Sequence, residues 1–115
     1  MRASGDGFWE LGLSDGSAWF SEWFHERLRS AAGVRRATFN DLRPIFSPDT
    51  WEMLLGHLRA HLEQRTPFDA KLPVRLADGR IEWWHLRGST LLNGIGHPVH
   101  VAGSVRDVTA EGRQG

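Results

Sequence analysis

Hydrophobic and polar residues alternate most regularly between residues 68 and 76. The apolar side of this alternation takes every second position, and its members are Phe68, Ala70, Leu72, Val74 and Leu76. A period of two predicts a β-strand with one buried face and one face in water. An Asp78-Gly79 turn follows, and residues 80–92 and 98–108 predict two further strands with a turn at 93–96 between them. The second half of the chain is therefore expected to form sequential antiparallel hairpins.

The first half of the chain predicts a hairpin followed by helical segments. Residues 8–13 and 18–20 are typical of short strands, and residues 14–17 between them have turn chemistry. Ser21 is placed to cap a helix from Glu22 to about Arg29, which residues 31–33 would end. Residues 38–46 are expected to be an irregular or short helical connection.

The clearest helix signal in the chain begins at Ser47. Ser47, Pro48 and Asp49 supply an N-cap, a proline at the first helical position and a carboxylate near the positive end of the helix dipole. The helix is expected to run to about Gln64. Apolar residues recur along it at helical spacing and form one stripe, which should pack on the sheet: Trp51, Leu54, Leu55, Leu58 and Leu62.

This order of elements predicts an α+β domain with one mostly antiparallel sheet and helices on one face. The 115 residues correspond to one ordinary domain. Its 14 basic and 14 acidic side chains cancel, so no net field attracts nucleic acid or anionic lipid. No apolar run is long enough to span a membrane, and no apolar signal segment opens the chain. We therefore expect a soluble, cytoplasmic module without a nucleic-acid partner or direct membrane contact.

Four short segments stand out along the chain. They are residues 9–11 (WEL), 47–49 (SPD), 78–83 (DGRIEW) and 103–109 (GSVRDVT). Together and in this order they resemble the PAS family, in particular the subgroup common in bacterial sensor histidine kinases and diguanylate cyclases. The resemblance implies the PAS fold, a five-stranded antiparallel sheet in the spatial order 2-1-5-4-3 with helices packed on its concave face. The domain would span residues 7–109, between an N-terminal linker (1–6) and the start of a C-terminal linker (110–115).

The resemblance also implies a function, that of a sensory or signal-relay module in a larger bacterial signalling protein. Such a module catalyses nothing itself, so no catalytic residue is expected, and an effector domain, a kinase or a cyclase, would follow in the same chain. Asp107 and Thr109 resemble the two polar residues that tie the last PAS strand to the outgoing signalling helix. The simpler interpretation, in which both residues cap their own backbone at a strand end, is compatible with this role.

Two other functions stay open from the sequence. One is a ligand-free structural module for dimerisation, which a solid core would favour. The other is a small cone-shaped α+β enzyme, which needs an acid or base inside an apolar cavity. Glu82, near the rim, is the only acidic candidate on the inward side of the strand register.

The inward positions of the strands and helices define a candidate ligand pocket. Its members are Trp9, Leu11, Phe24, Leu54, Leu58, Leu72, Val74, Trp84, Leu86, Val101 and Val105. These side chains can enclose a small apolar pocket or fill the core. The two indoles favour a filled core, because they occupy much of the space.

The residue types in this pocket disfavour a flavin. The chain has no cysteine, which excludes a cysteinyl flavin adduct and thiolate metal ligands. Flavin-binding PAS relatives present amide side chains to the ring, whereas Val74, Trp84 and Val105 stand at the positions that resemble them here. An apolar wall cannot satisfy the polar edge of a flavin.

Histidines on the long helix raise two further possibilities, haem and a metal ion. Some PAS relatives hold haem through a histidine on this helix, but Leu54 stands at the position that best matches the ligand. His57 and His61 have the four-residue spacing of two metal ligands, yet no further ligand accompanies them, and positions flanking the leucine stripe explain them more simply. We expect no cofactor and no metal.

The strand from Arg80 is apolar on both of its faces. If Trp84 and Leu86 face the helices, the outward row is Ile81, Trp83 and His85. An exposed aromatic row usually marks an interface. We therefore expect a homodimer packed through this face, with coverage of Trp83 by other parts of its own chain as the alternative.

Overall fold

The structure, a computed structural model, describes residues 6–28 and 37–112. Its strands are β1 (Gly7–Gly12), β2 (Ser17–Phe20), β3 (Ala37–Thr38), β4 (Phe68–Arg75), β5 (Ile81–Leu92) and β6 (Pro98–Asp107). Its helices are α1 (Glu22–Leu28), the 3-10 helix η1 (Phe39–Ile45), α2 (Pro48–Gln64) and α3 (Thr109–Gly112). The predicted end of the first helix, at residues 29–33, lies outside the described residues.

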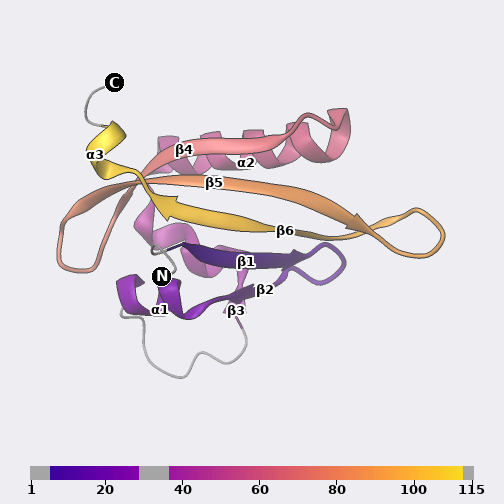
Figure 1. Cartoon of the computed structure of the whole chain (residues 1–115), viewed down its shortest axis with the longest axis horizontal. Helices are drawn as coiled ribbons and strands as arrows, with labels where there is room; N and C mark the ends of the chain where they lie inside the picture. The colour runs from indigo at the N-terminus through magenta and orange to yellow at the C-terminus, as the bar shows by residue number, and fades with distance from the viewer. Residues whose placement is uncertain (1–5, 29–36, 113–115) are drawn as a thin grey trace.

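The strands form one antiparallel sheet in the order β3-β2-β1-β6-β5-β4 (Figure 1). Without β3, a two-residue strand at the edge beside β2, this is the predicted order 2-1-5-4-3. The first and last of these strands lie side by side at the centre, with Leu11 opposite Val101 and Gly7 opposite Val105. The predicted α+β fold is confirmed.

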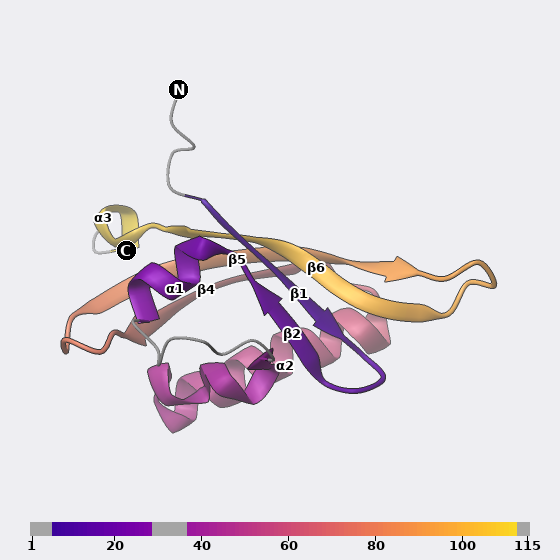
Figure 2. The ribbon, with the colours of Figure 1, turned by 90° about the horizontal axis from the view of Figure 1, so that it is seen from below.

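The helices α1, η1 and α2 lie on one side of the sheet (Figure 2). The longest, α2, begins as predicted, because Ser47 Oγ accepts the backbone N–H of Thr50 at 3.1 Å and Pro48 is the first helical residue. It ends at Gln64, and the C-cap residue Arg65 takes the left-handed conformation (φ 60°) and donates its backbone N–H to the carbonyl of His61. None of the described helices combines the length and the apolar character needed to cross a bilayer.

The apolar stripe of α2 packs on the sheet along only part of its length. Exposure increases along the predicted stripe: Trp51 and Leu54 are buried, Leu55 and Leu58 are half-buried, and Leu62 is exposed. The inclusion of Leu62 was wrong, because the row that follows Leu54 and Leu58 continues at His61 rather than at Leu62. His61 turns toward the sheet, where its ring meets Phe68 edge-on and its Nε2 lies 2.8 Å from Thr90 Oγ1.

The strands β4 and β5 alternate between the core and water, as predicted. Their inward side chains are buried and include Phe68, Ala70, Leu72 and Val74 from β4 and Glu82, Trp84 and Leu86 from β5. Leu72 lies opposite Trp84, and Ala70 lies opposite Leu86. Both strands therefore place large side chains against the helices, and this places the core between the sheet and α1, η1 and α2. The linker boundaries before residue 7 and after residue 109 stay a prediction.

Candidate ligand pocket and signal output

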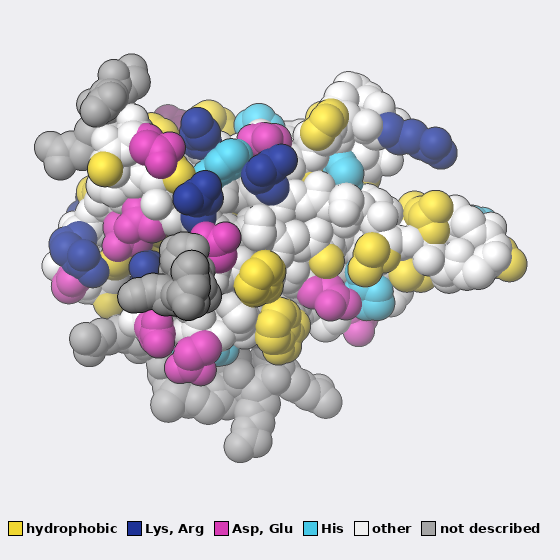
Figure 3. Space-filling model, viewed as in Figure 1, with side chains coloured by type: hydrophobic (Ala, Val, Ile, Leu, Met, Phe, Trp, Pro, Cys, Tyr) yellow, Lys and Arg dark blue, Asp and Glu magenta, His cyan; other side chains and the backbone are white. Residues whose placement is uncertain are grey.

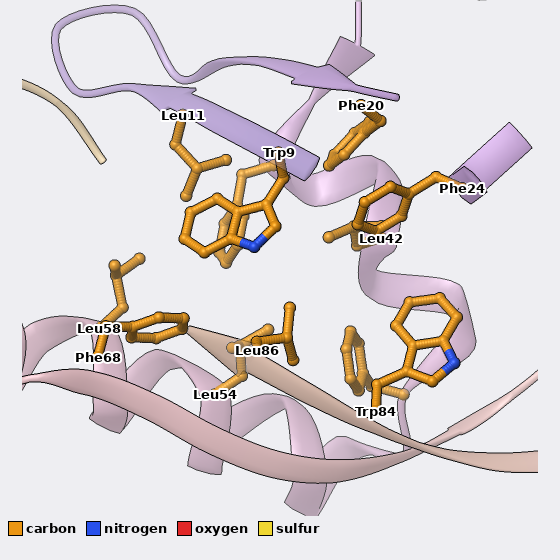
Figure 4. A pocket seen from close by; sticks show the side chains of 12 residues that line it. Trp9, Leu11, Phe20, Phe24, Leu42, Leu54, Leu58, Phe68, Trp84 and Leu86 are labelled. Atoms are coloured by element: carbon orange, nitrogen blue, oxygen red, sulfur yellow. The ribbon is translucent and has the colours of Figure 1, made fainter. Parts of the chain in front are cut away.

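A small cavity lies in the middle of this core, between the sheet and the helices. Its walls are aromatic and leucine side chains only: Trp9, Leu11, Phe20, Phe24, Phe39, Leu42, Phe46, Leu54, Leu58, Phe68, Trp84 and Leu86. Figure 4 shows these side chains converging from β1, β5, α1, η1 and α2. The cavity volume is about 20 Å³. A water molecule needs about 10–15 Å³ of such space, so the side chains leave room for roughly one small guest.

The rings inside the core contact one another through their edges, which explains why so little space remains. Trp84 lies 4.8 Å from Trp23 and 5.7 Å from Phe24, measured between ring centroids, and both pairs are T-shaped. At the other end of the cavity, Trp9 meets Phe68 edge-on at 5.5 Å. Edge-to-face pairs of this kind are favoured by the quadrupoles of aromatic rings.

Most of the predicted pocket residues line the cavity, but not all. Leu72, Val74, Val101 and Val105 are buried in the core without reaching the cavity wall. The sequence analysis missed five lining residues: Phe20, Phe39, Leu42, Phe46 and Phe68. Phe20 could have been found because it pairs with Trp9 across β1 and β2, and paired residues share a face. Phe39, Leu42 and Phe46 follow helical spacing in the segment that was predicted to be an irregular or short helical connection, and most of that segment forms the short helix η1.

The polar atoms of the lining residues are satisfied away from the cavity. Trp9 Nε1 donates to the carbonyl of Ser104 at 3.0 Å, and Trp84 Nε1 donates to Glu82 Oε1 at 2.9 Å. The lining side chains are tryptophan, phenylalanine and leucine, so none of them titrates. The cavity therefore offers a guest apolar contact only.

Glu82 is the one buried carboxylate near the cavity among the described residues, and cations surround it. Its side chain accepts the indole N–H of Trp84, and Glu82 is only 7% exposed. Arg27 Nε lies 3.5 Å from Oε1 and Arg80 Nη1 lies 3.7 Å from Oε2, which are distances of ionic contact. The Arg27 guanidinium also stacks on Trp23, 4.0 Å from the ring centroid. This cluster links α1 to β5, and Glu82 is not among the side chains that line the cavity.

The predicted output residues, Asp107 and Thr109, are brought together where the chain leaves the sheet. Asp107 Oδ1 accepts the backbone N–H of Thr109 at 2.9 Å and also the Thr109 hydroxyl. The same hydroxyl accepts the backbone N–H of Trp83 at 3.1 Å, and Val108 donates its N–H to the Trp83 carbonyl at 2.8 Å. Both backbone groups of Trp83 are therefore bonded to the start of the outgoing segment, and Val108 is buried beside them.

Comparisons with known proteins agree with this architecture. No family model matches the sequence, and no curated protein matches it. Among solved structures, a sensory box histidine kinase/response regulator from Burkholderia thailandensis is similar over 96% of this chain and 82% of its own, with 27% identity and a TM-score of 0.79. The chain has the PAS fold.

Other solved domains are also similar in fold to this chain, at lower identity. The N-terminal domain of a diguanylate cyclase with a PAS/PAC sensor from Marinobacter aquaeolei has a TM-score of 0.80 at 14% identity, covering 93% of this chain and 98% of that one. A PAS domain of a protein from Colwellia psychrerythraea has a TM-score of 0.70 at 15% identity, covering 92% and 88%. At these identities the likeness concerns the fold alone.

The outward row of β5 has the predicted register but is only partly exposed. Ile81 is 47% exposed, whereas Trp83 and His85 are half-buried. His85 Nε2 lies 2.7 Å from Asp69 Oδ1, so its ring already has a partner within the chain. The row is therefore a narrower surface than the sequence predicts.

The most exposed aromatic side chains of the sheet lie on β1 and β2, and the sequence analysis missed them. Trp19 is 56% exposed and Phe8 is 54% exposed. Figure 3 shows hydrophobic side chains gathered over these strands and again at the tip of the β5–β6 hairpin. The signal was available for Trp19, because it stands next to Phe20 in β2 and must face the opposite side of the sheet.

The two histidines of α2, His57 and His61, do not belong to a cluster of metal-ligating side chains among the described residues. His57 is exposed, and His61 donates from Nδ1 to the carbonyl of Thr66 at 2.6 Å while Nε2 meets Thr90. Within the part of the chain that the structure describes, no three His, Asp or Glu side chains converge as metal ligands. Leu54 reaches the cavity wall, but it cannot coordinate iron, and a cavity of about 20 Å³ does not fit a haem or a flavin as the side chains stand.

Proposed function

We propose that this PAS domain is a sensory or relay module of a larger signalling protein, with a kinase or cyclase effector later in the same chain. The observation that carries the proposal is the hydrogen-bonded tie between Thr109 and Trp83. Trp83 is next in sequence to Trp84, a fully buried side chain of the cavity wall. A change in the packing of Trp84 moves the backbone to which the outgoing segment is bonded.

The relay is a shift between two packings of the core, because a signal acts only through a difference in interaction with two states. The apolar walls favour a small apolar guest, and with about 20 Å³ free, its entry requires side chains to move. That movement is the event to be relayed. The likeness to domains of a sensory box histidine kinase and of a diguanylate cyclase supports an effector of these two kinds.

We also propose that the domain is non-catalytic and carries no resident cofactor. The rival enzyme needs an acid or base in the cavity, and the lining offers none, since Glu82 is engaged by Trp84 and lies between Arg27 and Arg80. Homodimerisation remains part of the proposal. It is supported by the apolar side chains exposed on the sheet, on Ile81 and at the tip of the β5–β6 hairpin.

The experiment that tests the relay removes the tie and measures effector output in the full-length protein. Thr109→Val deletes the hydroxyl that joins Asp107 to Trp83, which should lower the free energy of unfolding by about 1 kcal/mol and change the effector activity markedly. Thr66→Val, at an exposed threonine, is the matched control and should change neither. Unchanged effector output in Thr109→Val would refute the tie as the route of the signal.

A further inference from the structure

The turn between β5 and β6 (Figure 1) contains an asparagine followed by a glycine, Asn93 and Gly94, and both residues are exposed. An asparagine side chain loses its amide group when the backbone nitrogen of the next residue attacks its carbonyl carbon. Glycine hinders that attack least, because it has no Cβ. We propose that Asn93 is a site of spontaneous deamidation in the folded domain, and that the hydrogen bonds of the turn promote the reaction. This reaction is independent of the proposed relay.

Two backbone N–H groups of the turn are directed at Oδ1 of Asn93, the atom on which negative charge develops during the attack. Oδ1 accepts the N–H of Ile95 at 3.0 Å and the N–H of His97 at 2.9 Å. Donors held in place around such an oxygen stabilise the oxyanion that forms when a nucleophile adds to the carbonyl carbon. The turn therefore surrounds the reacting carbonyl of Asn93 in the manner of an oxyanion hole.

The attacking and the leaving nitrogen atoms are both free of hydrogen bonds within the part of the chain that the structure describes. Backbone bonds in this turn join Asn93 N–H to the carbonyl of His97 at 2.8 Å and Gly96 N–H to the carbonyl of Asn93 at 3.0 Å. Neither the Gly94 N–H nor Asn93 Nδ2 has an acceptor among the described residues. Neither atom has to leave a described partner before the Gly94 nitrogen attacks.

The reaction proceeds in two steps, with water as the only other reactant. In the first step, the Gly94 nitrogen loses its proton and bonds to Cγ of Asn93 while the Cγ–Nδ2 bond breaks, which releases ammonia and leaves a succinimide ring. In the second step, water opens the ring at one of its two carbonyl groups. The product at position 93 is an aspartate or an isoaspartate, and in the isoaspartate the main chain runs through the side-chain carboxyl group.

Both products change the charge of the β5–β6 hairpin. No Asp, Glu, Lys or Arg occurs between Arg87 and Arg106, so deamidation places a carboxylate in this stretch, directly after the exposed Leu92. An aspartate oxygen can still accept the N–H groups of Ile95 and His97, so the turn should persist in that product. An isoaspartate adds a methylene group to the main chain and should therefore distort the turn.

The test follows the mass of the purified domain during incubation and assigns the change to a peptide. The peptide that contains Asn93 should gain the mass difference between a hydroxyl and an amino group. The gain should be faster in alkaline than in neutral buffer, because the attacking nitrogen must lose its proton. Asn40, the other asparagine of the chain, is an internal control: it is also exposed, but it lies in η1 and precedes Asp41, so it should stay unchanged over the same period.

The Gly94→Ala variant tests the role of the attacking residue. The backbone of Gly94 is not left-handed and a Cβ there would meet nothing within 4 Å, so the variant should melt like the wild type. It should slow the conversion of Asn93 by about tenfold, which corresponds to about 1.4 kcal/mol in the barrier, because a Cβ crowds the nitrogen and narrows its conformations. Gly56→Ala, where a Cβ also meets nothing within 4 Å, should leave the rate unchanged.

A synthetic peptide of residues 89–98 separates activation by the turn from the reactivity of the sequence, since an isolated hairpin is at best marginally stable in water. The folded domain should convert at least as fast as the peptide, because the fold holds both N–H groups against Oδ1. Slower conversion in the folded domain would mean that the turn protects Asn93 and would overturn the activation. A folded domain that stays unchanged while the peptide converts, or equal rates for Gly94→Ala and wild type, would overturn the site itself.

Discussion

The indole of Trp9 lies so close to Gly88 that any side chain at position 88 should disturb the packing of the core. A Cβ added at Gly88 would lie 2.7 Å from Cη2 and 2.9 Å from Cζ2 of the Trp9 indole. The indole cannot simply retreat, because its Nε1 is bonded to the carbonyl of Ser104 and its ring packs edge-on against Phe68. Gly88→Ala therefore forces a shift of a side chain that lines the cavity.

The expected magnitude follows from two opposing effects. Overpacking of a core costs about 1–3 kcal/mol, and replacing glycine by alanine recovers about 0.4–1 kcal/mol by restricting the unfolded chain. Gly88→Ala should thus lower the free energy of unfolding by about 1–2 kcal/mol in urea denaturation. Gly56→Ala is the matched control: a Cβ there meets nothing within 4 Å, and alanine in a helix should stabilise by up to about 1 kcal/mol.

A double-mutant cycle isolates the contact itself. Trp9→Phe removes the two ring atoms that a Cβ at Gly88 would meet, so Gly88→Ala should cost little in that background. The coupling energy between the two substitutions should then be about 1 kcal/mol. Strict additivity, or a Gly88→Ala protein as stable as wild type, would refute the packing described for Trp9.

Three further predictions concern the strand register, a turn and the pocket. Leu72→Asp should lower the free energy of unfolding by more than about 3 kcal/mol in urea denaturation, because Leu72 is fully buried. Lys71→Asp, on the exposed face of the same strand, should change it by less than about 0.5 kcal/mol. Equal effects of the two substitutions would contradict the register. In an NMR titration, the pKa of Asp78 should lie below its ordinary value of 3.8, because the backbone N–H of Arg80 donates to the carboxylate. That interaction stabilises the fold above the ordinary pKa and is lost as the pH falls through the lowered one, so a value at or above 3.8 would contradict it. The visible spectrum of the purified protein should show no flavin or haem band, and a stoichiometric chromophore would overturn the proposal of a cofactor-free pocket.

The sequence predicts the fold well because its signals are local and agree with one another. The alternation of residues 68–76, the Asp78-Gly79 turn and the Ser47-Pro48 helix start each depend on neighbouring residues, and each is confirmed. The resemblance to PAS domains added the strand order, which local patterns alone do not determine. The strand β3 was not predicted, because its two residues are too few to show an alternation of apolar and polar positions.

The site is less predictable because it depends on how separate elements meet. Phe39, Leu42 and Phe46 were missed because their segment has no regular strand or long-helix signal, although its spacing fits one helical face. Leu62 was misplaced because the side of α2 that faces the sheet is decided by the position of β4. The β5–β6 hairpin extends beyond β4 because the register pairs Phe68, the first residue of β4, with Gly88, and strand lengths alone do not reveal this register.

The central claim is that the packing of the core is transmitted to the segment that leaves the fold at Thr109. The most direct measurement uses the Leu58→Ala variant, which enlarges the cavity because Leu58 forms part of its wall. Benzene is added as a small apolar guest, and the backbone amide signals are followed by NMR. The account predicts that benzene shifts the signals of the cavity residues together with those of Trp83, Val108 and Thr109. It also predicts that Thr109→Val removes the shift at Val108 and residue 109 while guest binding persists. Shifts confined to the cavity, with Val108 and Thr109 unchanged in the presence of the hydroxyl, would contradict it.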